Sequence, residues 1–504
     1  MTNMSQSNSH EKALENAITR CRERNITIPT FAQLRDPAII PQPIRDRLQA
    51  VGLWDLDPVN LFRITWKNEP TPHGGLYNTG NWIEFPPALT GVPARIIGLV
   101  GKWFPTGAHK VGAGFACLVP RLVTGQFDPT THKAVWPSTG NFCRGGAFDC
   151  ALLGCEAVAI LPEGMSRERF DWLEEIGAEI IATPGCESNV KEIYDKCWEI
   201  RRTRPDCIIF NQFEEFGNSV WHYHITGSAV RDIFDQIATP GDRLAAWVSA
   251  TGSAGTIAAG DYLKQVHPET RIAAVEALQC PTLLNNGFGD HRIEGIGDKH
   301  VPWIHNVRNT DFVCAIDDAQ CIALMRLFSE PEGTRLLENM SVDCETISKL
   351  PLLGISSICN LVASIKLARH EELTERDIIF CPLTDSMDLY ASRLEEERHA
   401  PASPPTTMGG ASRPPQPAEY THTTAARHFG RYLEAITTDN MRSLDLPARK
   451  SLHNLKYFTW VEQQGRTADE LRSLWDPDFW TEVYAQADTW DRQIEAFNAR
   501  VTST

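Results

Sequence analysis

The sequence has no long apolar segment. Within its 504 residues, no uninterrupted apolar run approaches the ~20 residues that a membrane-spanning helix requires. The segment from Met1 to Glu15 is polar and lacks the apolar centre of a secretion signal. We therefore expect a cytoplasmic protein without a membrane anchor.

The sequence has fewer basic than acidic residues. The chain has 48 Lys and Arg against 64 Asp and Glu, which gives a formal net charge of −16. Nucleic-acid binding normally needs a basic surface, so this balance argues against a nucleic-acid partner. The composition favours a small-molecule partner instead.

The cysteines do not form the pattern of a disulfide framework. The fourteen cysteines are scattered, and several of them, including Cys117, Cys150 and Cys359, lie within apolar runs. Such positions are typical of reduced thiols packed in a core.

Histidine clusters with zinc-ligand spacing are missing too. Neither His222-Tyr223-His224 nor the set His291, His300 and His305 has the His-x-x-x-His or paired-cysteine spacing that places ligands on one metal. We expect no metal ion.

Short β-branched runs alternate with longer helical segments from about Arg95 to Leu394. This alternation predicts parallel strands joined by crossover helices, an α/β core. The expected strands are Ala134–Trp136, Ala157–Leu161, Ile180–Thr183, Cys207–Asn211, Leu244–Ser249, Ile272–Val275 and Ile378–Leu383. Since ligands bind at the carboxyl ends of such strands, the loops that follow them are the candidate sites.

The two ends of the chain have a different composition. Residues 1–90 contain helical pieces, Glu11–Arg22 and Gln42–Val51, but no chemical motif. Segment 399–419 is rich in Pro, Ser, Thr and Gly and predicts a linker or exposed loop. Residues 420–504 are helical in pattern and carry four tryptophans, so we expect a helical extension packed on the core or on a neighbouring subunit.

Lys110 follows a Pro-Thr-Gly turn and begins an apolar, helix-like stretch from Val111 to Leu122. Burial at this position would lower the pKa of the amine and allow it to act as a Schiff-base nucleophile. An ordinary lysine near a helix start has the same local pattern, so this segment alone leaves both interpretations open.

Two loops after expected strands could hold an anion. Segment 137–146 places Ser138, Thr139 and Asn141 at a helix start, which is typical of a carboxylate or phosphate cradle, or of a simple helix cap. Segment 250–260 contains Gly252-Ser253-Ala254-Gly255-Thr256. It lacks the Lys-Ser/Thr pair of a triphosphate loop and the dinucleotide glycine spacing, so it favours a compact phosphomonoester.

A third loop, segment 382–390, follows the last expected strand and carries Asp385 and Ser386. A hydroxyl or carboxylate at the end of a central strand can contact a heterocyclic nitrogen. A plain helix cap is the alternative interpretation.

These motifs, taken in chain order, resemble the pyridoxal-phosphate enzymes of the tryptophan synthase β superfamily, fold type II. They are Pro-Thr-Gly-Ala-His-Lys ending at Lys110, Ser138-Thr139-Gly140-Asn141, Asn211-Gln212-Phe213, Gly252–Thr256 and Asp385-Ser386. Segments 291–297 and 353–357 resemble the cysteine synthase and cystathionine β-synthase branch, which is the closest branch. The Ala-His-Lys spelling is more similar to that of tryptophan synthase β chains. The resemblance covers about residues 94–394.

The resemblance implies a role in cofactor binding for eight residues. Lys110 would form the internal aldimine with pyridoxal 5'-phosphate and shuttle the Cα proton, and Asn141 would hydrogen-bond the 3'-oxygen. The phosphate would be held by Gly252, Ser253, Ala254, Gly255 and Thr256. Ser386 would face the pyridine nitrogen, where a neutral hydroxyl favours β-elimination over transamination.

The resemblance also implies where the amino-acid substrate binds. Ser138, Thr139 and Gln212 would hold its carboxylate. Phe142 stands where cysteine synthases have Thr and is followed by Cys143-Arg144. We therefore expect the substrate to be selected at these three residues.

The sequence allows two interpretations for each of two further residues near the expected site. Cys143 is a thiol beside a cation that would lower its pKa, or a small packing residue. His109 lies near the cofactor phosphate or has a structural role.

The implied function is β-elimination or β-replacement on an amino acid through an aminoacrylate intermediate, by a cysteine synthase-like lyase or synthase. Alternatives are a tryptophan synthase β-like, threonine synthase-like or dehydratase-like activity, an amino-acid isomerase, or a non-catalytic pyridoxal-phosphate-binding scaffold. We expect a homodimer or higher homo-oligomer.

The implied domains follow the same resemblance. Residues 91–130 and 240–398 would form a large cofactor-binding domain and residues 131–239 a small substrate-side domain. The N-terminal extension (1–90), the linker (399–419) and the helical C-terminal extension (420–504) would lie outside them.

Overall fold

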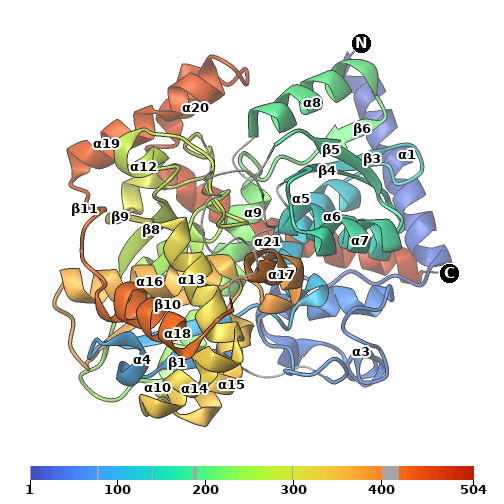
Figure 1. Cartoon of the computed structure of the whole chain (residues 1–504). Coiled ribbons are helices and arrows are strands. Elements are labelled where there is room, and N and C mark those ends of the chain that lie inside the picture. Colours follow the sequence, from blue (N-terminus) through green and yellow to red (C-terminus); the bar gives the residue numbers. More distant parts are fainter. Residues whose placement is uncertain are drawn as a thin grey trace, which may run out of the picture.

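The structure is a computed structural model that describes residues 2–75, 79–138, 140–185, 190–297, 299–399 and 419–503. It contains two β-sheets, each accompanied by helices (Figure 1). The α/β class and two-sheet organisation predicted from the sequence are confirmed. Most of the predicted linker, residues 400–418, lies outside the described residues.

The smaller sheet has four parallel strands in the order β5-β4-β3-β6. These strands are β3 (Lys133–Pro137), β4 (Glu156–Pro162), β5 (Glu179–Thr183) and β6 (Cys207–Ile209). The helices between them are α6 (Asn141–Leu153), α7 (Arg167–Glu175) and α8 (Val190–Thr203). Strand β3 is almost entirely buried, because a parallel strand between crossover helices is covered on both faces.

The larger sheet has seven strands in the order β1-β2-β10-β7-β8-β9-β11. Its inner strands are parallel, whereas the pairs β1–β2 and β11–β9 at its two edges are antiparallel. The strands are β1 (Trp82–Phe85), β2 (Arg95–Val100), β7 (Arg243–Ala250), β8 (Arg271–Ala277), β9 (Phe312–Ile316), β10 (Asp377–Leu383) and β11 (Met441–Ser443).

All seven strands expected from the sequence are present, with ends shifted by at most two residues. Strands β1, β2, β9 and β11 were not expected. Strands β1 and β11 form the two edges of the larger sheet and β2 and β9 are their neighbours, and β11 comes from the segment predicted to be helical. The C-terminal extension is therefore helical with one short strand.

Helices cover the larger sheet and join it to the smaller one. They are α4 (Pro87–Thr90), α5 (Lys110–Val123), α9 (Phe216–Trp221), α10 (Gly227–Ile237), α11 (Ile257–Val266), α12 (Thr282–Asn285), α13 (Asp318–Ser329), α14 (Pro331–Asn339), α15 (Cys344–Lys349), α16 (Ile355–His370) and α17 (Ala391–His399). Helix α5 packs against α6 and α9 and so lies between the two sheets.

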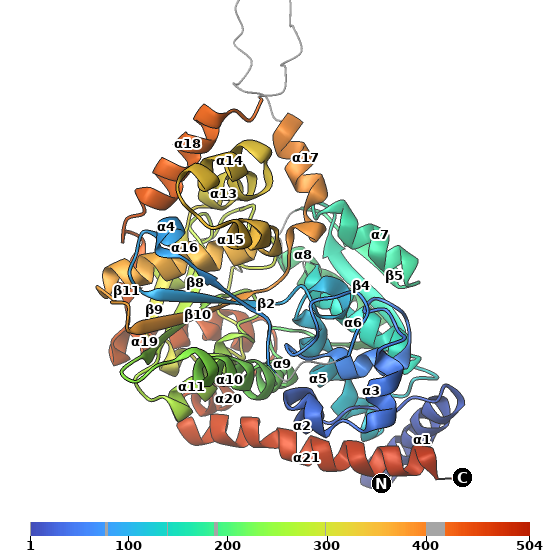
Figure 2. The same ribbon diagram turned by 90° about the horizontal axis from the view of Figure 1, so that it is seen from below.

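The N-terminal and C-terminal extensions pack together on the core. The N-terminal helices are α1 (Thr2–Glu23), α2 (Phe31–Arg35) and α3 (Gln42–Leu48), and the C-terminal ones are α18 (His422–Phe429), α19 (Leu446–Asn454), α20 (Ala468–Ser473) and α21 (Pro477–Thr502). Figure 2 shows α21 running beside α1 and α2, with both chain ends on one side. The Arg22 guanidinium donates to the Arg500 carbonyl at 2.7 Å. Of the two predicted placements for the extension, packing on the core is the one observed.

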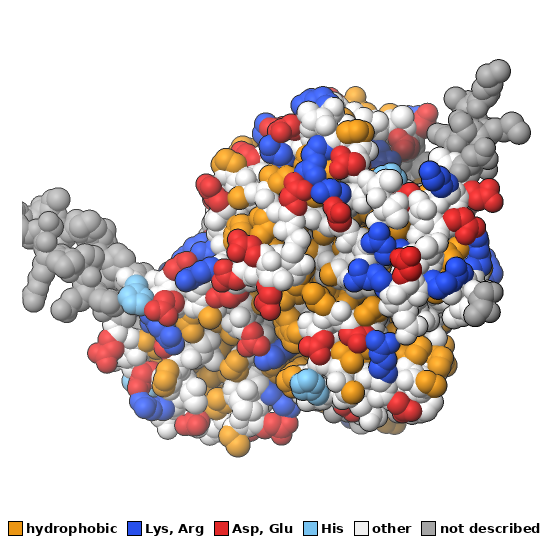
Figure 3. Space-filling view, turned by 90° about the vertical axis from the view of Figure 1, so that its right-hand side faces the viewer, with side chains coloured by type: hydrophobic (Ala, Val, Ile, Leu, Met, Phe, Trp, Pro, Cys, Tyr) orange, Lys and Arg blue, Asp and Glu red, His pale blue; other side chains and the backbone are white. Residues whose placement is uncertain are grey.

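Most of the described cysteines lie in the core, and charged side chains lie on the surface. Among the described residues, every cysteine is free and most are buried, and no helix is long and apolar enough to span a bilayer. On the face shown in Figure 3, acidic and basic side chains are interspersed with hydrophobic ones.

Candidate active site between the two sheets

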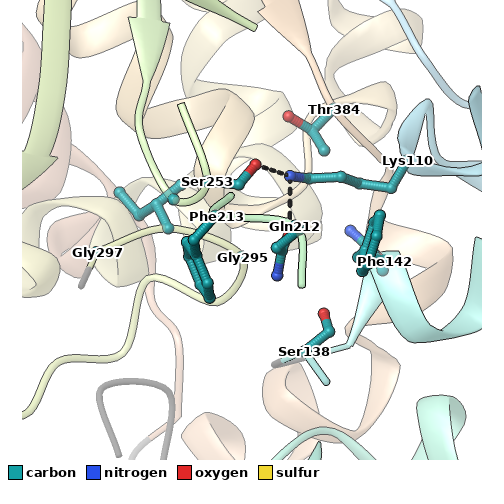
Figure 4. Close-up of a pocket in the computed structure, with 12 residues that line it drawn as sticks. Lys110, Ser138, Phe142, Gln212, Phe213, Ser253, Gly295, Gly297 and Thr384 are labelled. Carbon is teal, nitrogen blue, oxygen red and sulfur yellow. Dashed lines mark hydrogen bonds between the residues drawn. The ribbon is translucent and has the colours of Figure 1, made fainter. Parts of the chain in front are cut away.

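Lys110 is the first residue of α5, and two residues separate it from a 3₁₀ turn at Pro105–Gly107. Thr106 and Gly107 both have left-handed φ angles, of 70° and 69°, which turn the chain sharply before the helix. The Lys110 Nζ donates to Ser253 Oγ at 2.9 Å and to Gln212 Oε1 at 3.1 Å (Figure 4). Three residues predicted for one site from distant parts of the chain therefore meet at this amine.

Asn141 begins α6 and lines the same cavity as Lys110. Its amide nitrogen donates to Asp385 Oδ2 at 2.7 Å, whereas its buried Oδ1 has no partner among the described residues. Ser138 also lines the cavity, and its hydroxyl accepts from the Gly140 N–H at 3.1 Å. Thr139 lies outside the described residues.

The predicted phosphate loop joins β7 to α11. Gly252 and Ser253 line the cavity, and the Ser253 hydroxyl also accepts from Asn218 Nδ2 at 2.9 Å. A Cβ on Gly252 would lie 2.9 Å from the Gly295 carbonyl oxygen, and a Cβ on Gly255 would lie 2.0 Å from Asn218 Oδ1. The loop needs glycine at both positions because its neighbours approach the backbone so closely.

The backbone of this loop is suited to an anion. No backbone N–H from Gly252 to Thr256 donates a hydrogen bond to another described residue. Ala254 has a left-handed φ of 62°, an unfavourable conformation for a residue with a Cβ that is found at ligand-binding turns. Ala254, Gly255 and Thr256 do not line the cavity itself but lead from it into the helix N-terminus.

The end of β10 forms another wall of the cavity. Thr384 lines it, whereas Ser386, the predicted partner of the pyridine nitrogen, is buried but not among the lining residues. Between them, Asp385 accepts from Asn141 and from the Tyr390 hydroxyl, at 2.7 and 2.9 Å. Burial raises the pKa of the Asp385 carboxyl.

Of the segment Phe142-Cys143-Arg144, only Phe142 lines the cavity. The Cys143 thiol donates to the Gly140 carbonyl at 2.9 Å, and burial raises its pKa to about 12, so it stays protonated. The buried Arg144 guanidinium stacks on Trp172, 4.8 Å from its ring centre. Contrary to the expectation that all three residues face the substrate, Cys143 and Arg144 do not line the cavity, because successive helix residues point in different directions.

His109 lies outside the cavity as well. It is fully buried beside Trp66 and His222, with ring centres 5.5 and 4.9 Å away. Burial lowers the pKa of His109 to about 3, so the imidazole is neutral. Of its two interpretations, the structural one fits this packing.

The histidines considered as metal ligands are dispersed. His222 bonds to Thr226 and His305 to Thr310, each at 2.9 Å, and His300 packs among aromatic rings. The described part of the chain contains no group of three or more residues arranged to hold a metal ion.

Five cavity residues were not predicted as site residues: Phe213, Gly295, Ile296, Gly297 and Thr384. Gly295 and Gly297 belong to segment 291–297, which resembles the cysteine synthase and cystathionine β-synthase branch. Both glycines have left-handed φ angles, of 93° and 79°. Two glycines separated by one residue are typical of a turn, so this spacing could have indicated a loop at the site.

The residues present fit the groups of pyridoxal phosphate. N–H groups at a helix start that have no acceptor among the described residues suit a phosphate ester, and a lysine amine suits the aldehyde. The buried Asn141 Oδ1, also without a partner among the described residues, leaves the Asn141 side chain able to bond a ring substituent. A lysine at a helix start between the two sheets, opposite a loop suited to a phosphate, is the arrangement that the sequence predicts for a pyridoxal-phosphate enzyme.

Comparison with known proteins indicates the same cofactor. Residues 104–338 match the family described as pyridoxal-phosphate dependent enzyme. The chain therefore contains a pyridoxal-phosphate-dependent enzyme domain, which confirms the family, the enzyme class and the cofactor predicted from the sequence.

Individual relatives belong to the predicted branch. A probable cysteine synthase of Bacillus subtilis is 26% identical over 289 residues, which cover 57% of this chain and 85% of the relative. Cystathionine beta-synthase of Saccharomyces cerevisiae is 25% identical over 402 residues, 78% of this chain and 73% of the relative. The crystal structure of an O-acetylserine dependent cystathionine beta-synthase from Helicobacter pylori superposes with a TM-score of 0.52 at 24% identity, over 62% of this chain and 94% of that one.

Proposed function

We propose that the protein catalyses β-elimination or β-replacement on an amino acid, as a cysteine synthase-like lyase or synthase. One observation carries the proposal: the Lys110 amine lies within hydrogen-bond distance of both Ser253, in the phosphate loop, and Gln212, on the substrate side. The names of the curated relatives support the same reaction class.

Lys110 has two tasks in this proposal. Its Nζ holds the cofactor and then, once released, removes the proton from the substrate Cα. Bound pyridoxal phosphate supplies an electron sink that stabilises negative charge at that carbon. Since Lys110 Nζ already lies between Ser253 and Gln212, it can reach the cofactor and the substrate without moving to another part of the site.

The remaining predicted residues bind and orient the cofactor and the substrate. The N–H groups from Gly252 to Thr256, which have no acceptor among the described residues, bind the phosphate, and the Asn141 side chain hydrogen-bonds the 3'-oxygen. Ser138, Thr139 and Gln212 bind the substrate carboxylate. Ser386 keeps its predicted role toward the pyridine nitrogen, and Thr384, two residues before it, supplies the hydroxyl that lines the cavity.

The experiment that tests the cofactor assignment is the visible absorption spectrum of the purified protein. We expect a visible band that borohydride removes and that is missing in Lys110→Ala. The matched control is Lys102→Ala, because Lys102 is a nearby lysine whose amine is paired with Asp388 at 2.7 Å. A band that persists in Lys110→Ala would contradict the proposal.

The reaction itself is tested with O-acetyl-L-serine, L-serine and L-cysteine as probes. Release of pyruvate and ammonia identifies elimination, whereas consumption of an added thiol without pyruvate identifies replacement. If none of the probes changes the absorption band or gives a product, the proposed reaction class is wrong.

We infer the domain division and the assembly from the same resemblance. The four-stranded sheet lies within residues 131–239, which supports the small domain, and five strands of the seven-stranded sheet lie within residues 91–130 and 240–398, which supports the large one. The edge strands β1 and β11 of the larger sheet come from the segments predicted as extensions. A homodimer or higher homo-oligomer is tested by light scattering on the purified protein.

A further inference from the structure

The C-terminal extension reaches a wall of the active-site cavity. Its π-helical turn Tyr457–Val461 follows α19 and carries Trp460, which is fully buried. Trp460 packs 5.5 Å from His300 and 6.0 Å from Trp303, between ring centres. Neither of these two residues belongs to the extension, so Trp460 is inserted into the core of the enzyme domain.

Two side chains of the extension fix the backbone of segment 301–305. The Trp460 indole N–H donates to the Val301 carbonyl at 2.8 Å. The buried Lys456 amine donates to the carbonyls of Trp303 and His305, at 2.8 and 2.7 Å. These bonds satisfy three buried carbonyls, which are costly to leave unpaired.

Segment 301–305 in turn holds Phe213. The Ile304 backbone N–H donates to the Phe213 carbonyl at 3.2 Å. His300 packs edge-on against the Phe213 ring, with centres 5.0 Å apart, and its Nε2 lies 3.2 Å from the Tyr194 hydroxyl. Phe213 therefore has backbone and ring contacts to the residues that Trp460 and Lys456 fix.

Phe213 lines the cavity directly after Gln212, which accepts from the Lys110 amine (Figure 4). It is a large apolar side chain in a cavity whose other lining groups are mostly small or polar. A small displacement of this ring changes the space available to a substrate side chain, because packed aromatic walls discriminate by size.

We propose that Trp460 is a positioning residue for Phe213, so that the C-terminal extension sets which amino-acid side chains the pocket accepts. This inference rests on the proposed function for the identity of the ligand, an amino acid. The extension is then an integral part of the active-site wall, and not only an assembly element.

The test compares Trp460→Phe with Trp480→Phe in the full-length, cofactor-loaded protein. Trp480 is a matched control, because it is also buried in the extension and its indole N–H also donates to a carbonyl, that of Leu474 at 2.9 Å. Its ring packs against Phe216 and Tyr484 instead of His300.

Binding of L-serine and of the larger O-acetyl-L-serine is measured by titration of the visible band. We expect Trp460→Phe to change the ratio of the two dissociation constants about fivefold, the size of a modest pocket change. Trp480→Phe should leave this ratio unchanged even where it lowers the melting temperature. Equal ratios in the parent and Trp460→Phe would overturn the inference.

Phe213→Leu provides a second, direct change of the wall. Because Trp460 acts through Phe213, the effect of Trp460→Phe on the ratio should largely disappear in the Phe213→Leu background. Additive effects of the two substitutions would contradict the proposed coupling.

A measurement without any ligand separates this inference from the proposed function. Hydrogen exchange in segments 207–213 and 299–305, neither of which contains the Phe216 contact of Trp480, should be faster in Trp460→Phe than in the parent, and unchanged in Trp480→Phe. If no probe amino acid binds the parent, the proposed function fails, and the exchange data still test the link to Phe213. Unchanged exchange in both segments would overturn that link.

Discussion

The Asn141 side-chain amide donates to the Asp385 carboxylate at 2.7 Å, across 244 positions of the chain. Asn141 begins the first helix after β3, in the smaller sheet, and Asp385 follows β10, in the larger one. The bond therefore fixes the two sheets relative to each other at the cavity. It also fixes the amide so that its oxygen is the atom left without a partner among the described residues.

Asn141→Ala should lower the affinity for pyridoxal phosphate by roughly tenfold, because a buried hydrogen bond to a charged or polar ligand contributes about 1–2 kcal/mol. Titration of the apoprotein with the cofactor, followed by absorption, measures this change. Tyr390→Phe is the control, since it removes the other hydrogen bond to Asp385 without removing a cavity residue. A similar loss of affinity in both variants would show that only the Asp385 network matters.

Much of this site could be predicted from the sequence because each part has its own local signal. The buried parallel strands are apolar runs, and the loops after β3, β7 and β10 carry hydroxyls and glycines at helix starts. Lys110, Asn141 and Ser253 could therefore be predicted as site residues, although no local pattern could show that they lie close together.

Other parts of the site could not be predicted, for physical reasons. Cys143 and Arg144 follow Phe142 directly, but successive helix residues are rotated by about 100°, so adjacency in sequence does not give a shared face. Phe213 carries no reactive group. The three-residue strand β11 is too short for a periodic pattern and forms only because β9 offers an open edge.

Gly255→Ala should weaken cofactor binding and destabilise the protein. The new methyl group would lie 2.0 Å from Asn218 Oδ1, so Asn218 must move, and its amide would release Ser253. We expect a loss of about 1–3 kcal/mol in the free energy of unfolding, typical of overpacking. Urea unfolding and cofactor titration measure the two effects.

The control for this substitution is Gly430→Ala. Gly430 is helical, and a Cβ there would meet only Glu434 Oε2 at 3.8 Å, an ordinary contact. This variant should be neutral or slightly more stable, since alanine favours helix. If Gly255→Ala behaves in the same way, the close approach at the phosphate loop does not constrain that position.

The two hydroxyls at the end of β10 should have separable effects. Ser386→Ala should shift the absorption maximum of the bound cofactor, because it removes the predicted partner of the pyridine nitrogen. Thr384→Val should lower substrate or cofactor affinity without that shift, since Thr384 lines the cavity. A spectral shift in Thr384→Val alone would transfer the predicted role from Ser386 to Thr384.

Asp149 should make the protein less stable as the pH rises. It is fully buried in α6, and neither carboxylate oxygen has a hydrogen-bond partner among the described residues. Burial raises its pKa well above the usual value, so the folded protein keeps a proton that the unfolded chain releases. The stabilising effect of this proton is fully present below the ordinary pKa of Asp and is lost as the pH rises toward the raised pKa.

Asp149→Asn should remove that pH dependence, because an amide does not titrate. The free energy of unfolding of the parent should fall relative to the variant by up to about 1.4 kcal/mol per pH unit, the limit for one proton. Urea unfolding at pH 5, 6, 7 and 8 measures the difference. We expect the free energy of unfolding of Asp149→Asn to increase relative to that of the parent with each pH step. A difference that stays constant over this range would mean that Asp149 is ionised in the folded protein.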